Sequence, residues 1–299
     1  MKLTIIVCYY RGHRHIEKCL RSLVPQLIEG TVECLVIENG VDVDANVKNK
    51  FPAVNYIGIE TNSGLGPARN LGLQLAKGEF VWYIDDDAWV PNGTIKYLLE
   101  SVLVADCIYG GGLVLNANNQ YTLSKVYHDF YYSPLQKALK LIIGTNMYFR
   151  TSALKTVEGF HPDLNRADEA YVVRKLSAKG FKGNFISNVE VFHNQPSDFK
   201  NILRVFIDNG RYRCKMSQGI FAKFIRTGLH SVTFVFPVVA IFSLPLALLL
   251  VFIRFIYSKT HLILIKNRLY YWPIIILLNT WRIVLEDYGY TKEFVGKFF

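Results

Sequence analysis

The chain has 299 residues, a net charge of +10 and a hydrophobic content of 51%. This length allows one large α/β domain with an appendage, and the positive charge suits an anionic partner such as a nucleotide, a nucleic acid or an acidic lipid surface. The basic residues are spread along the chain, which argues against a nucleic-acid-binding tail. The cysteines are odd in number and lack zinc-ligand spacing, which argues against a metal knuckle or a disulfide framework and favours a reducing cytoplasm.

The first part of the chain alternates short apolar runs with segments of helical periodicity. The apolar runs are rich in β-branched and aromatic residues and predict buried strands at Leu3–Tyr10, Val32–Ile37, Val54–Ile59 and Glu79–Ile84. Helical spacing predicts helices over 16–27, where Pro25 is a kink or an end, and over 66–76. This alternation indicates βαβ units and a mainly parallel sheet, so the expected fold class is α/β. The first run is short and is followed at once by Arg11 and Arg14, whereas a secretory signal peptide has its charges first, a longer apolar stretch and a small-residue cleavage site; a strand is therefore expected.

The pattern becomes less regular beyond residue 87. We expect a helix from Pro91 to about Ala105 and a later helix from Asp168 to Lys179, stopped by Gly180. Strand-like runs lie at Ile108–Leu115, Tyr121–Tyr127, Gly144–Arg150 and Val189–Phe192. An amphipathic helix is expected from about Phe199 onward.

The C-terminal part carries the excess of hydrophobic residues. Residues Leu229–Ile253 contain no Asp, Glu, Lys or Arg, and a helix of that length reaches about 37 Å, enough to cross a hydrocarbon core of about 30 Å. A second apolar segment covers about 269–285. Basic residues flank the first run on both sides, so a re-entrant hairpin broken at Pro237 and Pro245 fits as well as a span, and a buried core helix is the other alternative. We predict a domain at 1–218 followed by a membrane-associated helical tail at 219–299.

Acidic residues lie at the ends of two predicted strands. Glu38 follows the second strand, and Asp85, Asp86 and Asp87 follow the fourth. Ligands of parallel α/β sheets bind at such carboxyl ends. Adjacent carboxylates repel one another unless a cation neutralises them, and oxygen ligands suit Mg²⁺ or Mn²⁺. Because strand side chains alternate, Asp85 and Asp87 should share one side. We predict a divalent-metal site here; the alternative is a solvated acidic turn.

Five segments of the chain occur in an order that is typical of one enzyme family. They are Thr4–Tyr10, Val36–Gly40, Asn62–Gly72, Tyr83–Asp87, and Gly144–Asn146 shortly before Arg150. On these residues the chain resembles glycosyltransferase family 2, the inverting enzymes of the GT-A fold, over roughly residues 1–215. The resemblance implies a GT-A fold and a nucleotide-diphosphate sugar as donor.

The resemblance also implies roles for individual residues. Tyr9, Arg11 and Glu38 would line the nucleotide pocket, and Arg69 would bind the nucleotide or its phosphates; without the family, Glu38 reads equally well as an ordinary turn residue. Asp85 and Asp87 match the DxD element. The first reaches ribose or metal-bound water and the last binds the metal, while Asp86 is grouped with the nucleotide-binding residues.

The same resemblance implies roles for two further segments. His193 follows the last predicted strand, where GT-A enzymes place a metal or diphosphate ligand, although a lone His is more often structural. Gly144–Asn146 would shape the junction between donor and acceptor, with Asn146 bonding to a sugar.

The general base is expected at the start of the 168–179 helix. An inverting transfer needs one carboxylate to take the proton of the acceptor hydroxyl. The family places it in an acidic pair that opens a helix and is followed by an Arg, which Asp168, Glu169 and Arg174 match. The acid that normally precedes the base is Ala167 here. We favour Asp168, with Glu169 as the alternative register and an N-cap acid as the structural alternative.

The expected function is therefore metal-dependent, inverting transfer of a sugar to a glycan or lipid-linked acceptor, by an enzyme at the cell membrane whose catalytic domain faces the cytoplasm. The Gln-x-x-Arg-Trp element of processive synthases is absent, which favours single additions. The alternative is a membrane-anchored, non-catalytic scaffold that binds nucleotide sugars. A dinucleotide-binding oxidoreductase is disfavoured because Arg69 occupies the place of the third glycine after Gly64 and Gly66, and no P-loop or RNA-binding motif occurs.

Overall fold

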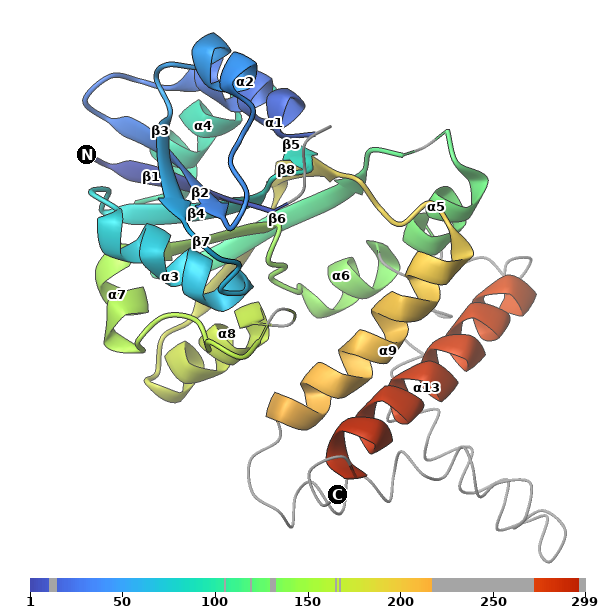
Figure 1. Cartoon of the computed structure of the whole chain (residues 1–299). Coiled ribbons are helices and arrows are strands. Elements are labelled where there is room, and N and C mark those ends of the chain that lie inside the picture. Colours follow the sequence, from blue (N-terminus) through green and yellow to red (C-terminus); the bar gives the residue numbers. More distant parts are fainter. Residues whose placement is uncertain are drawn as a thin grey trace, which may run out of the picture. The chain divides into compact units, whose positions relative to one another are not determined.

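A computed structural model describes residues 1–10, 15–104, 106–118, 120–129, 133–164, 166, 168–216 and 272–295. The chain forms two compact units (Figure 1). Unit 1 comprises Met1–Ala117 and Lys140–Asn194, and unit 2 comprises Asn118–Leu139 and Gln195–Phe299. The boundary at residue 218 that the sequence suggests stays a prediction.

Unit 1 is built on a mixed sheet of eight strands in the order β3-β2-β1-β4-β7-β6-β8-β5. The strands are β1 (Leu3–Tyr9), β2 (Val32–Asn39), β3 (Asn55–Ile59), β4 (Phe80–Asp85), β5 (Ala88–Trp89), β6 (Tyr109–Asn116), β7 (Asn146–Arg150) and β8 (Gly183–His193). β3, β2, β1 and β4 are parallel, as predicted, and β6 is parallel to β8. β7 is antiparallel to both of its neighbours, and β5 is antiparallel to β8.

Helices cover both faces of this sheet. They are α1 (Ile16–Leu23) with a 3₁₀ turn at Val24–Gln26, α2 (Ala45–Lys50), α3 (Leu65–Leu75), α4 (Thr94–Tyr97) continued by a π-helical turn at Leu98–Val102, α7 (Thr151–Thr156) and α8 (Asp168–Ala178). Alternation along β1 divides the core: Ile5 and Val7 pack with α1, α2 and α4, whereas Ile6 packs with α3, α7 and α8. Pro25 ends α1, one of the two outcomes predicted for it.

Two predicted elements differ from the structure. The strand predicted at Tyr121–Tyr127 is wrong: Thr122–Tyr127 form helix α5, whose Tyr127 packs against Phe206. Tertiary packing thus overrides the strand propensity of an aromatic-rich run. The helix predicted from Pro91 begins instead at Thr94, because Gly93 adopts a left-handed backbone (φ 83°) that interrupts a right-handed helix.

Asn146 has a different role from the sugar contact expected of it. Its side chain is fully buried, and its Oδ1 accepts a hydrogen bond from Trp82 at 3.1 Å. Its Nδ2 donates to the carbonyls of Leu113 at 3.1 Å and Val189 at 2.9 Å. β6 and β8 shift register between Gly112 and Leu113. Asn146 therefore satisfies carbonyl groups at this irregularity and has a structural role.

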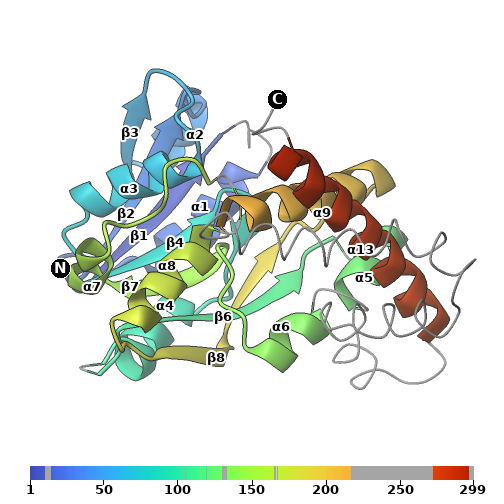
Figure 2. The ribbon, with the colours of Figure 1, turned by 90° about the horizontal axis from the view of Figure 1, so that it is seen from below.

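Unit 2 contains four described helices, α5, α6 (Ser133–Leu139), α9 (Phe199–Met216) and α13 (Trp272–Val295). α9 and α13 lie side by side in both views (Figures 1 and 2). Glycines bring their backbones close: a Cβ on Gly210 would lie 1.9 Å from the carbonyl oxygen of Glu286, and one on Gly289 would lie 2.0 Å from that of Ile207. The expected amphipathic helix after Phe199 is α9.

The predicted hydrophobic tail is only partly covered by the structure. The segment 229–253 lies outside the described residues. The segment 269–285 overlaps α13, in which Arg282 and Glu286 form a buried ion pair at 3.2 Å. Among the helices of the described residues, none is both long enough and apolar enough to cross a bilayer.

Candidate active site

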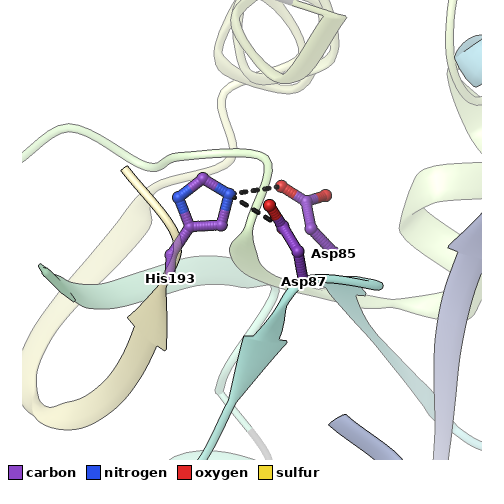
Figure 3. Close-up of side chains that lie close together, drawn as sticks. All are labelled: Asp85, Asp87 and His193. Carbon is purple, nitrogen blue, oxygen red and sulfur yellow. Dashed lines mark ion pairs between the residues drawn. The ribbon is translucent and has the colours of Figure 1, made fainter. Parts of the chain in front are cut away.

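Two carboxylates and one imidazole meet at the carboxyl end of β4. Asp85 is the last residue of β4, and Asp87 directly precedes β5, which pairs with the end of β8 at His193. His193 Nε2 lies 3.1 Å from Asp87 Oδ1 and 3.7 Å from Asp85 Oδ2 (Figure 3). Asp86 points elsewhere, because its Oδ2 accepts a hydrogen bond from the backbone N–H of Tyr10 at 3.2 Å. The alternation predicted for the acidic run is therefore confirmed.

Neighbouring loops hold these side chains in place. β4 and β7 pair so that Ile84 lies opposite Asn146, which brings Thr145 beside Asp85. The Thr145 hydroxyl donates to Asp85 Oδ2 at 2.6 Å. The sequence assigned Thr145 only to a junction between donor and acceptor; its hydroxyl instead orients a candidate metal ligand. Only the register of the antiparallel β7 identifies this contact.

The three side chains strongly affect one another's protonation. Burial alone would lower the pKa of His193, but Asp87 and then Asp85 raise it to about 9. Burial would raise the pKa of Asp87, yet His193 lowers it below its usual range. Burial and then the charge of Asp87 raise the pKa of Asp86 to about 7. Without a bound cation, the site is therefore partly neutralised by protons.

This donor set fits a divalent cation. Atoms of Asp85, Asp87 and His193 that can act as ligands all lie within 4.8 Å of one another. Two carboxylates and one imidazole suit Mn²⁺ well and Mg²⁺ less well, since Mg²⁺ prefers oxygen ligands alone. A metal would replace the proton that His193 holds while it pairs with the carboxylates.

The affinity of this site for Mn²⁺ should rise with pH. Because the folded-state pKa of His193 is about 9, the metal must displace a proton below that pH, which costs up to about tenfold in affinity per pH unit. In metal-free protein, the pairing of protonated His193 with Asp87 and Asp85 stabilises the folded state. This stabilisation is complete below pH 6.5, the pKa of His193 in the unfolded chain, and is lost as the pH rises through about 9. Calorimetric titration with Mn²⁺ at several pH values between about 6 and 8 measures the first effect. An affinity independent of pH would contradict this protonation state of His193.

A buried arginine joins this cluster to the candidate base. Arg69 is 2% exposed and lies on the face of α3 that packs inward with Leu73. Its Nη1 lies 2.5 Å from Asp168 Oδ2, and its Nη2 lies 3.4 Å from Asp85 Oδ1. Asp168 is 1% exposed because it shares the inward face of α8 with Val172. The structure thus brings together residues from α3, β4 and α8.

Glu169 lies next to the same arginine but in a different electrostatic state. Its Oε2 would be 3.4 Å from a Cβ built on Gly144, while the Arg69 nitrogens would be 3.0 and 3.2 Å from that Cβ. Burial, followed by the charge of Asp168, raises the pKa of Glu169 above its usual range. A raised pKa favours the protonated form of Glu169, which cannot accept another proton.

The residues expected to hold the nucleotide lie on the neighbouring strands β1 and β2. Tyr9 is fully buried, and burial followed by the charges of Asp86 and Glu38 raises the pKa of its hydroxyl to about 12. Glu38 is 4% exposed; its Oε1 lies 2.7 Å from Lys48 Nζ and accepts the backbone N–H of Val43 at 2.5 Å. Arg11 lies outside the described residues.

Asn39 was not predicted to have a role. It is 4% exposed, and its Oδ1 accepts hydrogen bonds from the backbone N–H and the hydroxyl of Ser63, at 2.9 and 3.0 Å. Its Nδ2 donates to Asn62 Oδ1 at 3.0 Å and to the Gly64 carbonyl at 3.1 Å. These bonds fix the loop that starts α3 and so help to place Arg69. Its position at the end of β2, directly after Glu38, was the available signal.

Comparisons with known proteins identify a family and a fold. The family described as "Glycosyl transferase family 2" matches residues 4–158. Glycosyltransferase GlyA of Streptococcus pneumoniae is 28% identical over 138 residues, which cover 44% of this chain and 20% of GlyA. The matched part is therefore a small fraction of that relative.

Solved structures share the fold. A mannosyltransferase from Pyrobaculum calidifontis, solved in complex with GDP-Man and Mn²⁺, superposes with a TM-score of 0.62 at 15% identity, covering 99% of this chain and 88% of that chain. Residues 1–349 of TarS from S. aureus, solved with UDP-GlcNAc, give a TM-score of 0.54 at 15% identity, covering 99% and 92%. At these identities the likeness concerns the fold, which is of the mixed α/β GT-A type.

Proposed function

The chain belongs to glycosyltransferase family 2, and from that premise we propose that it transfers a sugar from a nucleotide-diphosphate sugar to an acceptor hydroxyl, with inversion at the anomeric carbon. The observation that carries this proposal is the meeting of a candidate metal site, Asp85, Asp87 and His193, with a buried carboxylate, Asp168, through one arginine. Cation and base are the two groups that such a displacement needs.

The donor would lie across the carboxyl ends of β1, β2 and β4. Tyr9 is the last residue of β1, and Glu38 lies next to the end of β2, where the nucleotide is expected. Arg11 follows β1 in the sequence. Asp85 and Asp86 would border the ribose and diphosphate. Asp85, Asp87 and His193 would hold Mn²⁺ or Mg²⁺. When bound, the cation neutralises the negative charge that develops on the departing diphosphate.

Asp168 would accept the proton during transfer. The acceptor oxygen forms a bond to the anomeric carbon while the bond from that carbon to the diphosphate oxygen breaks. The nucleoside diphosphate leaves with the bonding electron pair, and the acceptor proton moves to the Asp168 carboxylate. The ion pair with Arg69 supports Asp168 as the ionised group. The raised pKa of Glu169 makes that neighbour the weaker candidate for a base.

The acceptor is proposed to be a glycan or a lipid-linked glycan, handled at the cytoplasmic side of the cell membrane. The uncharged run at 229–253 supports this location, because its length matches a bilayer. Fractionation of cells that express the full chain, followed by alkaline carbonate washing, tests the attachment. Recovery of the chain in the soluble fraction before washing would contradict it.

A ligand screen tests the function itself. Thermal unfolding of the full chain is measured with UDP-, GDP-, CDP- and dTDP-sugars, each with and without Mn²⁺, because a ligand that binds only folded protein raises the melting temperature. We expect stabilisation by at least one donor, and more with the metal than without it. The donor found is then incubated with candidate acceptors, and nucleoside diphosphate release is followed. Lack of metal-assisted stabilisation by every donor and every free nucleoside diphosphate would contradict the proposal.

A further inference from the structure

Arg69 occupies a position that its expected role as a nucleotide ligand does not explain. Its side chain is 3% exposed and lies between two carboxylates. Nη1 contacts Asp168 and Nη2 contacts Asp85, and Nη2 also donates to the Gly144 carbonyl at 3.2 Å. A diphosphate that bound this guanidinium would have to compete with carboxylates already in place.

The surroundings fix the guanidinium on several sides. Its central carbon lies 5.4 Å from the ring centroid of Phe160 and 5.9 Å from that of Tyr83. The Tyr83 hydroxyl donates to the backbone carbonyl of Arg69 at 3.2 Å. Gly144 leaves room for the side chain, since a Cβ there would approach the Arg69 nitrogens to 3.0 Å. A planar, forked cation is held here in one orientation, which a lysine would not reproduce.

The charges around Arg69 give it a second property. Asp85 Oδ1 is 3.4 Å from Nη2, so the guanidinium lies next to a candidate ligand of a divalent cation. A positive charge at this distance weakens the binding of a cation to the same carboxylate. The same charge balances Asp168 at the start of α8. Arg69 therefore acts on the candidate metal site through Asp85 and on the candidate base through Asp168.

We propose that Arg69 is a positioning residue that couples the metal-binding carboxylate Asp85 to the candidate base Asp168, and that it does not bind the donor. This inference deepens the proposed function and rests on it for the role of Asp168. Arg69 holds the Asp168 carboxylate in place for the acceptor hydroxyl and keeps Asp85 oriented toward His193. Its positive charge also lowers the affinity of the site for a divalent cation.

Two substitutions separate its charge from its geometry. Arg69→Gln removes the positive charge, so the site should bind Mn²⁺ alone about tenfold more tightly, while kcat falls by about 10²-fold. Arg69→Lys keeps the charge but cannot bridge two carboxylates. It should therefore bind Mn²⁺ as the wild type does and still lose kcat by a factor of about 10 or more. The KM for the donor should change by less than about threefold in both variants.

Arg150→Gln is the matched control. Arg150 lies at the opposite end of the same β4–β7 pair, where its Nη1 contacts Glu79 at 2.6 Å. Its loss should leave Mn²⁺ affinity and kcat unchanged, even if the melting temperature falls. The control therefore distinguishes a site-specific effect from general destabilisation.

The Mn²⁺ measurement, made by electron paramagnetic resonance of the free ion, needs neither donor nor acceptor, so it stands even if sugar transfer fails. Unchanged or weaker Mn²⁺ binding by a folded Arg69→Gln variant would overturn the coupling to Asp85. If Arg69→Gln does not fold, Arg69→Lys decides the matter through its kcat and donor KM. A raised donor KM with unchanged kcat in either variant would show that Arg69 is a donor ligand and overturn the proposal.

Discussion

Replacing Asp168 by Asn should lower the turnover of the transferase by about 10²–10⁴-fold, because the variant loses proton transfer from the acceptor hydroxyl. Asp168 forms a buried ion pair with Arg69. Asn keeps the size of the side chain but has no negative charge to balance the positive charge of Arg69. Donor affinity should change little, because the candidate metal ligands remain. Single-turnover transfer and calorimetric donor binding measure the two quantities separately.

Glu169→Gln is the companion variant for this prediction. The raised pKa of Glu169 makes its protonated, uncharged form favourable, and Gln resembles that form. This variant should keep turnover within about tenfold of the wild type. Full activity in Asp168→Asn together with a large loss in Glu169→Gln would transfer the role of base to Glu169. Melting temperatures of both variants identify a loss that comes from unfolding of α8.

Replacing Asp87 by Ala should weaken Mn²⁺ binding by about 10²-fold or more, because it removes one of three candidate ligands and leaves His193 without its nearest carboxylate. Metal-assisted binding of the donor should weaken in parallel. Since Asp87 is the main charge that raises the pKa of His193, the pH dependence of the remaining affinity should also shift toward lower pH.

Asp163→Ala serves as the control for the metal experiment. Asp163 is an exposed residue of unit 1 whose backbone N–H donates to His161 at 3.1 Å, and the Ala variant keeps that backbone group. Its loss removes one negative charge without touching the acidic cluster. Equal Mn²⁺ affinity in Asp87→Ala and Asp163→Ala would rule out the proposed metal site.

The sequence was most informative where local pattern and burial agree. Three of the parallel strands at the start of the chain, β1, β2 and β4, are buried along almost their whole length, so their apolar runs were enough to predict them as strands. The acidic run was informative for the same reason: a strand end fixes which side each carboxylate takes, and Asp86 points away from Asp85 and Asp87 as expected.

Prediction failed where a distant partner decides the role of a residue. Asn146 looked like a polar residue available to a sugar, but its amide is used by carbonyls of Leu113 and Val189, which no local signal indicates. Tyr121–Tyr127 has the composition of a strand and is helical because of its packing in unit 2. The role expected of Arg69 stays a prediction, but its ion pair with Asp168 joins residues 99 positions apart, a contact that the local sequence does not indicate.

The sequence by itself therefore determined the fold class, the family resemblance and the identity of the acidic residues, because these depend on strand periodicity and on side-chain chemistry at strand ends. The tertiary structure alone decided which groups meet. Antiparallel pairing of β7 with β4 brings Thr145 to Asp85, and that of β5 with β8 brings His193 to Asp85 and Asp87. The inward face of α3 places the guanidinium of Arg69 between Asp85 and Asp168. Contacts of this kind join residues far apart in the chain, so their electrostatic consequences arise only in the folded protein.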